Sequence, residues 1–186
     1  DYNVAMGYLA LSANTLGSRS TAIGTVALAA QNFTTATDAY NTAVGYQAGG
    51  SVTTGVQNTF LGGLSGDALT DADYNAGLGF GTLSTDTLGS KSTAVGYAAL
   101  QNQNFTTATD SFNTAVGYEA GNSVTTGIED TLIGALAGDA LTTGKENVAV
   151  GYRSLSGDTQ GKRSIAIGKD ALRVQNFTTA TETYNV

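Results

Sequence analysis

The sequence predicts an all-β protein, a parallel β-solenoid in which short coils stack into a rod. A five-residue motif recurs ten times: Asn, Ser or Asp, any residue, usually Ala, an aliphatic residue and Gly. Its period of about 17 residues is too short for helical repeats of about 34 residues or propeller blades of about 40. The recurring Gly and β-branched residues also disfavour helix. The motif glycines, expected to be structural, are Gly7, Gly24, Gly45, Gly62, Gly79, Gly96, Gly117, Gly134, Gly151 and Gly168.

Each position of the motif predicts a role in the coil. The residue before the Gly is always a large aliphatic, so we expect this column to form the core. The residue two positions earlier is mostly β-branched and shares the same face of a strand. The Ala between them predicts a smooth second face that suits close packing against another layer or chain. The predicted core residues are Met6, Ile23, Val44, Leu61, Leu78, Val95, Val116, Ile133, Val150 and Ile167.

The first motif position holds only Asn, Ser or Asp. At one height in successive coils, such side chains are expected to hydrogen-bond to the backbone at a corner or to form a ladder. A longer repeat of four coils lies above the short one, because residues 15–70 match residues 87–142 at 39 of 56 positions. We interpret residues 1–186 as a single array with super-repeats at about 1–72, 73–144 and 145–186, the last incomplete. Both ends cut through a coil, so we expect a longer parent chain.

One coil in each super-repeat is longer than the others, and these coils predict a row of loops on one side of the rod. The extra residues fall in the segment QNFTTATD at 31–38 and 103–110, and in QNFTTATE at 175–182. Insertions in solenoids form loops on one face, which is often the binding face. The candidate partner-contact residues are Asn32, Phe33, Thr34, Asn104, Phe105, Thr106, Asn176, Phe177 and Thr178.

The segments NTAVGYQAG at 41–49 and NTAVGYEAG at 113–121 carry a resemblance to two related groups. They resemble repeat arrays of bacteriophage tail fibres and spikes. They are also similar to the head repeats of trimeric autotransporter adhesins, which form a left-handed parallel β-roll within a homotrimer from shorter coils. The resemblance implies a rigid segment of a phage tail or virion appendage with host-receptor contact, or alternatively a bacterial adhesin head or stalk. It implies a homotrimer, partnered by other virion or tail proteins and by a host surface glycan or protein, on a virion or cell surface.

Composition argues against several other classes of function. The chain has no Cys and no His, so it lacks thiolates and the usual proton shuttle, and we expect no cofactor, no metal and no enzyme activity. A net charge of −7 disfavours a nucleic-acid partner. A transmembrane segment needs about 18 consecutive apolar residues, a run that the sequence lacks, so we expect no membrane insertion. Clustered acids that break the repeat would indicate a catalytic groove, whereas here the acids follow the repeat.

Four motifs have a functional and a structural interpretation. The Asn-Phe-Thr sequons could carry glycans, or be ordinary loop residues. Asp67 and Asp139 could bind Ca²⁺, or be solvated turn residues. Paired Thr residues could indicate an ice-binding array, although these pairs fall at turns. An aromatic column could stack sugars or form a stabilising ladder. That column comprises Tyr8, Tyr46, Phe80, Tyr97, Tyr118 and Tyr152.

Overall fold

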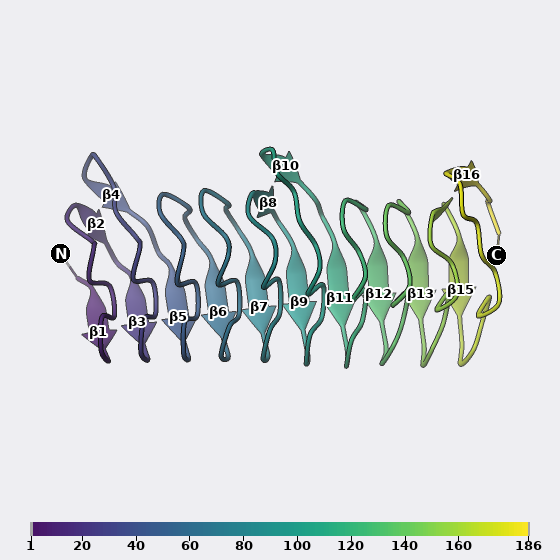
Figure 1. Cartoon of the computed structure of the whole chain (residues 1–186), viewed down its shortest axis with the longest axis horizontal. Helices are drawn as coiled ribbons and strands as arrows, with labels where there is room; N and C mark the ends of the chain where they lie inside the picture. The colour runs from purple at the N-terminus through teal and green to yellow at the C-terminus, as the bar shows by residue number, and fades with distance from the viewer. Residues whose placement is uncertain (1, 186) are drawn as a thin grey trace.

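The computed structural model describes residues 2–185 and confirms the predicted parallel β-solenoid. Ten short strands, one per coil, form a single sheet along the rod, and none of the described residues lies in a helix (Figure 1). Its strands in spatial order are β1 (Val4–Met6), β3 (Thr21–Ile23), β5 (Thr42–Val44), β6 (Thr59–Leu61), β7 (Ala76–Leu78), β9 (Thr93–Val95), β11 (Thr114–Val116), β12 (Thr131–Ile133), β13 (Val148–Val150) and β15 (Ile165–Ile167).

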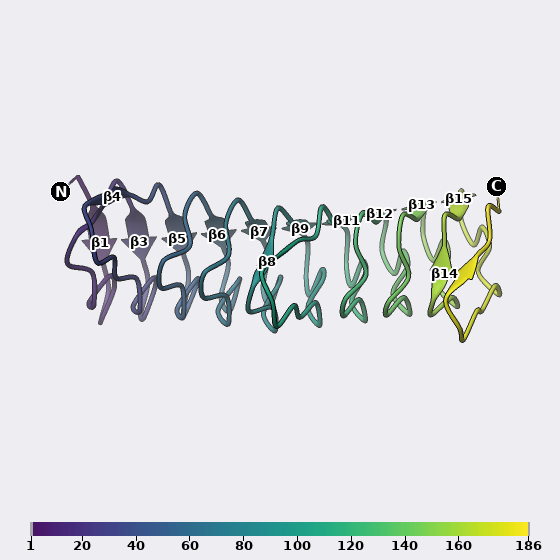
Figure 2. The same cartoon turned by 90° about the horizontal axis from the view of Figure 1, so that it is seen from above.

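The pairing register follows the motif at every step. Val4 pairs with Thr21, Thr21 with Thr42 and Thr42 with Thr59, so equivalent residues lie beside one another despite the change in spacing. The last described residue extends the pattern, because the Ile165 amide donates to the Asn185 carbonyl at 2.7 Å. At about 4.8 Å per coil, ten coils form a rod roughly 48 Å long. The sheet lies along one side of this rod (Figure 2).

Each lengthened coil adds a two-stranded parallel sheet away from the main one. The first pair is β2 (Gly17–Ser18) with β4 (Thr37–Asp38). The second is β8 (Gly89–Ser90) with β10 (Thr109–Asp110), and the third is β14 (Gly161–Lys162) with β16 (Thr181–Glu182).

The Ala column of the strands lines the interior of the coil, whereas the sequence pattern predicted that the large aliphatic column would do so. Ala22, Ala43, Ala94, Ala115 and Ala149 are fully buried, whereas Ala5 in the first coil is exposed. The predicted core column lies on the outside of the coil, so that prediction is wrong for the single chain. Met6, Leu78, Ile133 and Ile167 are between 39% and 69% exposed. The other six members are half-buried: Ile23, Val44, Leu61, Val95, Val116 and Val150.

The coil is narrow, and this explains why Ala faces inward. Leu side chains from the opposite wall, four residues after the motif Gly, fill the space above the Ala column; Leu28, Leu83 and Leu100 are fully buried. A large aliphatic on the sheet would compete with them for that space. The Ala column therefore does pack against another layer, but that layer is the far wall of its own coil. It is not a surface on which another chain can pack.

The motif Gly is required by the close approach of successive coils. At Gly62 φ is +138°, a conformation that side chains disfavour. A Cβ at Gly62 would also lie 2.4 Å from the carbonyl oxygen of Gly79 in the next coil. A side chain here would both strain the backbone and push the coils apart, which accounts for Gly in the first nine motifs; Gly168 has a φ of +116° but no atom of another coil nearby among the described residues.

Core volume is conserved between neighbouring coils. Where the Ala column holds Phe60, the positions of the inward Leu are occupied by Gly49 and Gly66. A Cβ at Gly66 would lie 2.4 Å from Cε1 of Phe60, and one at Gly49 would lie 3.0 Å from its Cδ2. Leu132 is flanked in the same way by Gly121 and Gly138. One large residue on the sheet therefore replaces two Leu side chains from the far wall.

The Asn, Ser or Asp column forms the predicted ladder. Asn58 illustrates the usual rung: its backbone N–H donates to Oδ1 of Asn41 at 2.9 Å, and its own Oδ1 accepts from the N–H of Asn75 at 2.9 Å. Its Nδ2 donates to the carbonyl of Ala72 at 2.7 Å. Each buried amide thus satisfies backbone groups at the corner of two coils.

The exchange between Phe60 and its flanking glycines leads to a prediction about stability. Phe60→Ala is expected to lower the free energy of unfolding by about 3–5 kcal/mol, because it leaves a cavity. Adding Gly49→Leu and Gly66→Leu to Phe60→Ala should restore most of this loss, since it recreates the pattern of Ala22 with Leu28. Urea unfolding measures both effects. A triple variant no more stable than Phe60→Ala would contradict the explanation, and Gly66→Leu alone should destabilise by overlap with the ring.

Candidate functional site

The three inserted loops project from the same side of the rod, at β4, β10 and β16 (Figure 1). Each loop contains a buried base and an exposed tip. At the first loop Phe33 is only 5% exposed, whereas Thr34, Thr35 and Ala36 are all exposed. The second loop repeats this arrangement, with Phe105 also 5% exposed, and in the third loop Phe177 is half-buried.

The predicted partner-contact residues therefore divide into two groups. Phe33 and Phe105 lie over Gly17 and Gly89 of the preceding coil, where a Cβ would come within 2.8 Å of either ring. They cannot contact a partner, so their assignment as contact residues is wrong. The Thr members reach solvent, namely Thr34, Thr106 and Thr178. The Asn members accept hydrogen bonds from Thr hydroxyls of the preceding coil: Asn32 from Thr15, Asn104 from Thr87 and Asn176 from Thr159.

A Gln anchors the start of each inserted loop; Gln31 and Gln103 are fully buried, and Gln175 is half-buried. Nε2 of Gln103 donates to Ser92 Oγ at 2.9 Å and to a carboxylate oxygen of Asp86, and its Oε1 accepts from Asn113 at 2.8 Å. Asp86 also accepts from the N–H of Phe105 at 3.0 Å and of Gly89 at 3.1 Å. All four polar side chains of this network are buried and hydrogen-bonded, so the base of the loop is rigid.

This network explains why the ladder has Ser before each inserted loop. At most rungs the Asn amide donates to a carbonyl 14 residues ahead, as Asn41 does to Gly55. The residue at that separation from Ser20 is Thr34, which lies in the exposed loop and cannot serve as that acceptor. Gln31 supplies the missing amide instead, donating to Ser20 Oγ at 3.1 Å. The joint presence of Ser, Gln and an insertion in every super-repeat is a signal from which this network could have been predicted.

A row of cations and aromatic rings borders the loops, and sequence reasoning did not find it. The guanidinium carbon of Arg19 lies 5.5 Å from the ring centre of Tyr2 and 5.6 Å from that of Tyr40. The same guanidinium pairs with Asp38 at 2.9 Å. Equivalent ion pairs join Lys91 to Asp110 at 2.6 Å and Arg163 to Glu182 at 3.0 Å. The sequence carries a pattern that predicts this row. In each super-repeat, the residue just before the ladder residue is a cation in one coil and an aromatic in the next, as with Arg19 and Tyr40.

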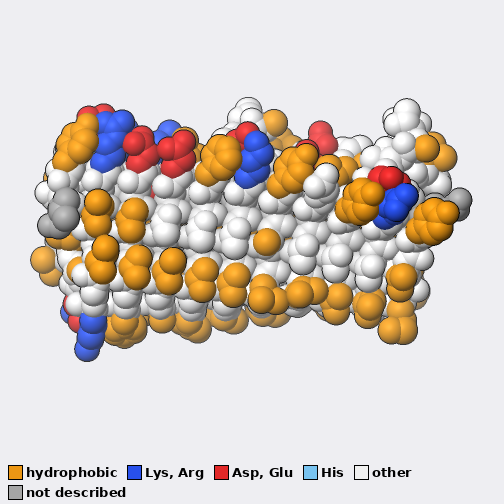
Figure 3. Space-filling view, turned by 180° about the vertical axis from the view of Figure 1, so that it is seen from behind, with side chains coloured by type: hydrophobic (Ala, Val, Ile, Leu, Met, Phe, Trp, Pro, Cys, Tyr) orange, Lys and Arg blue, Asp and Glu red, His pale blue; other side chains and the backbone are white. Residues whose placement is uncertain are grey.

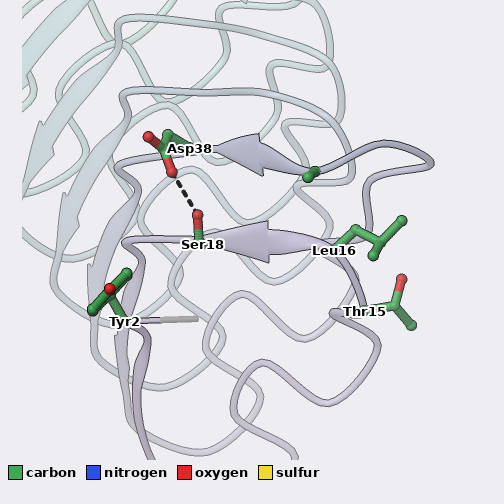
Figure 4. Close-up of a pocket in the computed structure, with 6 residues that line it drawn as sticks. Tyr2, Thr15, Leu16, Ser18 and Asp38 are labelled. Carbon is green, nitrogen blue, oxygen red and sulfur yellow. Dashed lines mark hydrogen bonds between the residues drawn. The ribbon is translucent and has the colours of Figure 1, made fainter.

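A hollow of about 300 Å³ opens beside the first loop. Its lining, drawn in Figure 4, comprises Tyr2, Thr15, Leu16, Ser18, Ala36 and Asp38. Ser18 Oγ donates to Asp38 Oδ1 at 2.6 Å. This hydrogen bond, followed by the contact with Arg19, lowers the pKa of Asp38 below its ordinary value. The carboxylate is therefore ionised at neutral pH and is unsuited to act as a general acid.

The aromatic column is a stacked ladder in the middle of the rod. The rings of Phe80 and Tyr97 lie 5.9 Å apart and those of Tyr97 and Tyr118 lie 5.3 Å apart, with interplanar angles of 10° and 12°. Both faces of Tyr97 are thus turned toward neighbouring rings, leaving its edge at the surface. Since sugar stacking uses a free ring face, the geometry favours the stabilising ladder at Tyr97.

The outward face of the large sheet is a second candidate surface. It carries the aliphatic column in the middle, with the mostly Thr column on one side and the aromatic column on the other. Figure 3 shows the hydrophobic side chains as an unbroken row along the rod, while Lys, Arg, Asp and Glu gather at the edge of the view. Tyr46, Phe80 and Tyr118 are each at least half exposed, as is Val4 at the first strand. This stripe is the longest apolar feature on the face shown.

The candidate calcium residues do not form a cluster. Asp67 and Asp139 each have a raised pKa because burial disfavours the charged carboxylate. Within residues 2–185, no three acidic side chains gather closely enough to hold a metal ion. In the same range the structure contains no helix long and apolar enough to cross a membrane.

Comparisons with protein-family models, curated proteins and solved structures found no significant match.

The division of the inserted loop into base and tip leads to a prediction. Phe105→Ala should lower the free energy of unfolding by about 3 kcal/mol, because it empties the buried site over Gly89. Thr106→Ala, the matched change at the exposed tip, should alter it by less than about 0.5 kcal/mol. Denaturant unfolding gives the two values, and amide hydrogen exchange should show lost protection at β8 and β10 only for Phe105→Ala. Equal effects of the two changes would contradict the division.

Proposed function

We propose that the chain is a structural segment of a phage tail fibre, spike or other virion appendage, and that it acts as a rigid rod. The observation that carries the proposal is the long apolar stripe on a solenoid whose coils pair without interruption from β1 to β15. Repeat arrays of this kind gain stability by stacking and serve as extended scaffolds.

The stripe supports assembly of the rod as a homotrimer. A sheet three residues wide and ten coils long presents on the order of 500 Å² of surface. Its aliphatic column is apolar, and the flanking Thr methyl groups and aromatic rings extend a patch of the size found at interaction sites. Three narrow sheets can meet around one axis, with the aliphatic columns at the centre and the Thr and aromatic columns at the flanks. Water would then be excluded from Met6, Leu78, Ile133 and Ile167, the most exposed members of the column. The smooth face first expected to serve this purpose, the Ala column, is already buried.

The inserted loops are placed to contact other molecules in such an assembly. They project at one edge of the rod and not from the middle of the sheet face (Figures 1 and 3). Association through the stripe leaves the Thr34, Thr106 and Thr178 tips outside, where they are available to a host surface glycan or protein or to other tail proteins. A bacterial adhesin head or stalk is the alternative setting for the same rod. The long super-repeat, conserved at 39 of 56 positions, and the NTAVGYQAG segment favour the phage fibre.

Any coding sequence that flanks residues 1–186 in the gene would separate these two settings. A tail-attachment or chaperone domain supports the fibre, whereas a membrane anchor supports the adhesin.

Association through the stripe leads to a prediction about oligomeric state. The native chain should sediment as a trimer, and Leu78→Lys with Ile133→Lys should sediment as a monomer with an unchanged sheet spectrum in circular dichroism. Both side chains point outward, so the coil itself tolerates the charge, whereas a shared apolar centre does not. Thr85→Lys is the control, because Thr85 is exposed and lies away from the sheet. A stable native monomer, or a double Lys variant that stays trimeric, would rule out this interface.

The proposed role as a rod predicts its length. Duplicating one super-repeat, which holds four coils, should extend the particle by roughly 19 Å, at about 4.8 Å per coil. Small-angle scattering or electron microscopy of the native and extended chains measures the difference. An unchanged length with a larger cross-section would show that the added coils fold back and that the array is not a rod.

A further inference from the structure

One rung of the ladder differs from the others in a way that matters chemically. Most rungs between coils hold an Asn or Ser, but Asp130 occupies the rung between Asn113 and Asn147. Its equivalent in the preceding super-repeat, which has a closely matching sequence, is Asn58. The chain therefore contains the same buried site twice, once with an amide and once with a carboxyl group.

The first oxygen of Asp130 does what an Asn oxygen does. Oδ1 accepts from the N–H of Asn147 at 2.9 Å and from its Nδ2 at 3.0 Å, and the Asp130 N–H donates to Oδ1 of Asn113 at 3.0 Å. This half of the rung is complete. Asp130 is fully buried, so its carboxyl group is shielded from bulk solvent.

The second oxygen is in the place where other rungs have a donor. Asn113 donates from Nδ2 to the carbonyl of Gly127, and Asn147 does so to that of Gly161, each at 2.8–3.0 Å and 14 residues ahead. The corresponding carbonyl for Asp130 is that of Gly144. A Cβ at Gly127 would lie 2.5 Å from the Gly144 oxygen and 3.0 Å from Asp130 Oδ2, so the two oxygens are neighbours. Oδ2 is buried and has no hydrogen-bond partner among the described residues.

We propose that Asp130 is a proton-dependent rung, whose carboxyl group is protonated in the folded chain and donates its hydrogen to the carbonyl oxygen of Gly144. Protonation turns Oδ2 into a donor, which restores the hydrogen bond that Asn makes elsewhere in the ladder. Ionisation leaves two acceptors close together in the interior of the coil, an arrangement that weakens the stacking of these coils.

The surrounding charges act in the same direction. Burial raises the pKa of Asp130 to about 7, and the hydrogen bonds from Asn147 oppose this rise without cancelling it. The acidic groups that act on it are Glu129 beside it and Glu146 on the next coil, and both favour the protonated form. The adjacent rungs, Asn113 and Asn147, are neutral. Glu146 itself is paired with Arg163 at 2.8 Å, which limits its influence.

The sign of the pH dependence follows from the raised pKa. A carboxyl group with a pKa near 4 in the unfolded chain and about 7 in the folded chain takes up a proton on folding between these values. The stabilisation due to protonation is fully present below about pH 4 and is lost as the pH rises through about 7. The contribution of Asp130 to the stability of the surrounding coils is therefore largest below about pH 4 and falls as the pH rises toward 7.

The two equivalent sites provide a matched experiment. The unfolding equilibrium is measured between pH 4.5 and 8.5 for the native chain, for Asp130→Asn and for Asn58→Asp. Relative to Asp130→Asn, the native chain should lose stability as the pH rises, by on the order of 100-fold in the unfolding equilibrium constant. Asn58→Asp should create a second such dependence. The comparison of variants isolates this group from Asp67 and Asp139, whose pKa values are also raised.

A direct titration completes the test. The carboxyl ¹³C resonance of Asp130 should titrate with a midpoint near pH 7 in the folded chain. A midpoint near 4, or parallel stability profiles for the native chain and Asp130→Asn, would overturn the proposal. Because Asp130 is inside the coil, both outcomes are independent of whether the outer sheet face binds other copies.

Discussion

Parallel pairing of each coil with the next is the constraint on which the rest of this structure depends. It places every side chain directly beside its own equivalents, at roughly one strand spacing. Side chains that interact favourably with identical side chains, such as the ladder amides and the stacked rings, are therefore favoured at equivalent positions of successive coils. Residues that need space are excluded, and the motif Gly of each coil lies against the carbonyl of the next. Like charges in adjacent coils need a cation nearby, as Glu146 has in Arg163.

The same constraint separates the inside of the coil from the outside in a way that hydrophobicity alone does not reveal. Both strand faces carry apolar columns, one of Ala and one of larger aliphatics. A single chain buries the smaller column, because its lumen already holds Leu28 and its equivalents from the opposite wall. The larger column is left at the surface, where burial requires more than one chain. Apolar residues on both faces of a narrow sheet thus indicate a coil that packs its inner face within the chain and, as we propose, its outer face against another chain.

The sequence therefore predicts some features of this protein well and others poorly. Period, register and the corner ladder follow from the motif, because each depends only on equivalent residues lying together. The strands of the large sheet do not by themselves reveal which of their two faces points inward. That choice depends on the Leu side chains of the opposite wall, such as Leu28, which fill the interior. Phe33 and Phe105 were misassigned for a similar reason: an aromatic in an inserted loop is a surface residue only if the preceding coil offers no cleft, and Gly17 and Gly89 provide one. The row of Arg19, Lys91 and Arg163 was readable but was obscured by the stronger motif columns.

The exchange of Phe60 against Gly49 and Gly66 has a consequence for how such an array can change in length. A deletion or duplication that begins at an arbitrary coil would bring a Phe against a Leu, or a Gly against an Ala, and so create a clash or a void at the new junction. A change by one whole super-repeat reproduces every partner, including the Ser, Gln and inserted loop of each unit. Recombination between aligned gene segments should therefore be tolerated in steps of a super-repeat and selected against in steps of a single coil. The match of residues 15–70 to residues 87–142 at 39 of 56 positions is consistent with growth by whole blocks of four coils.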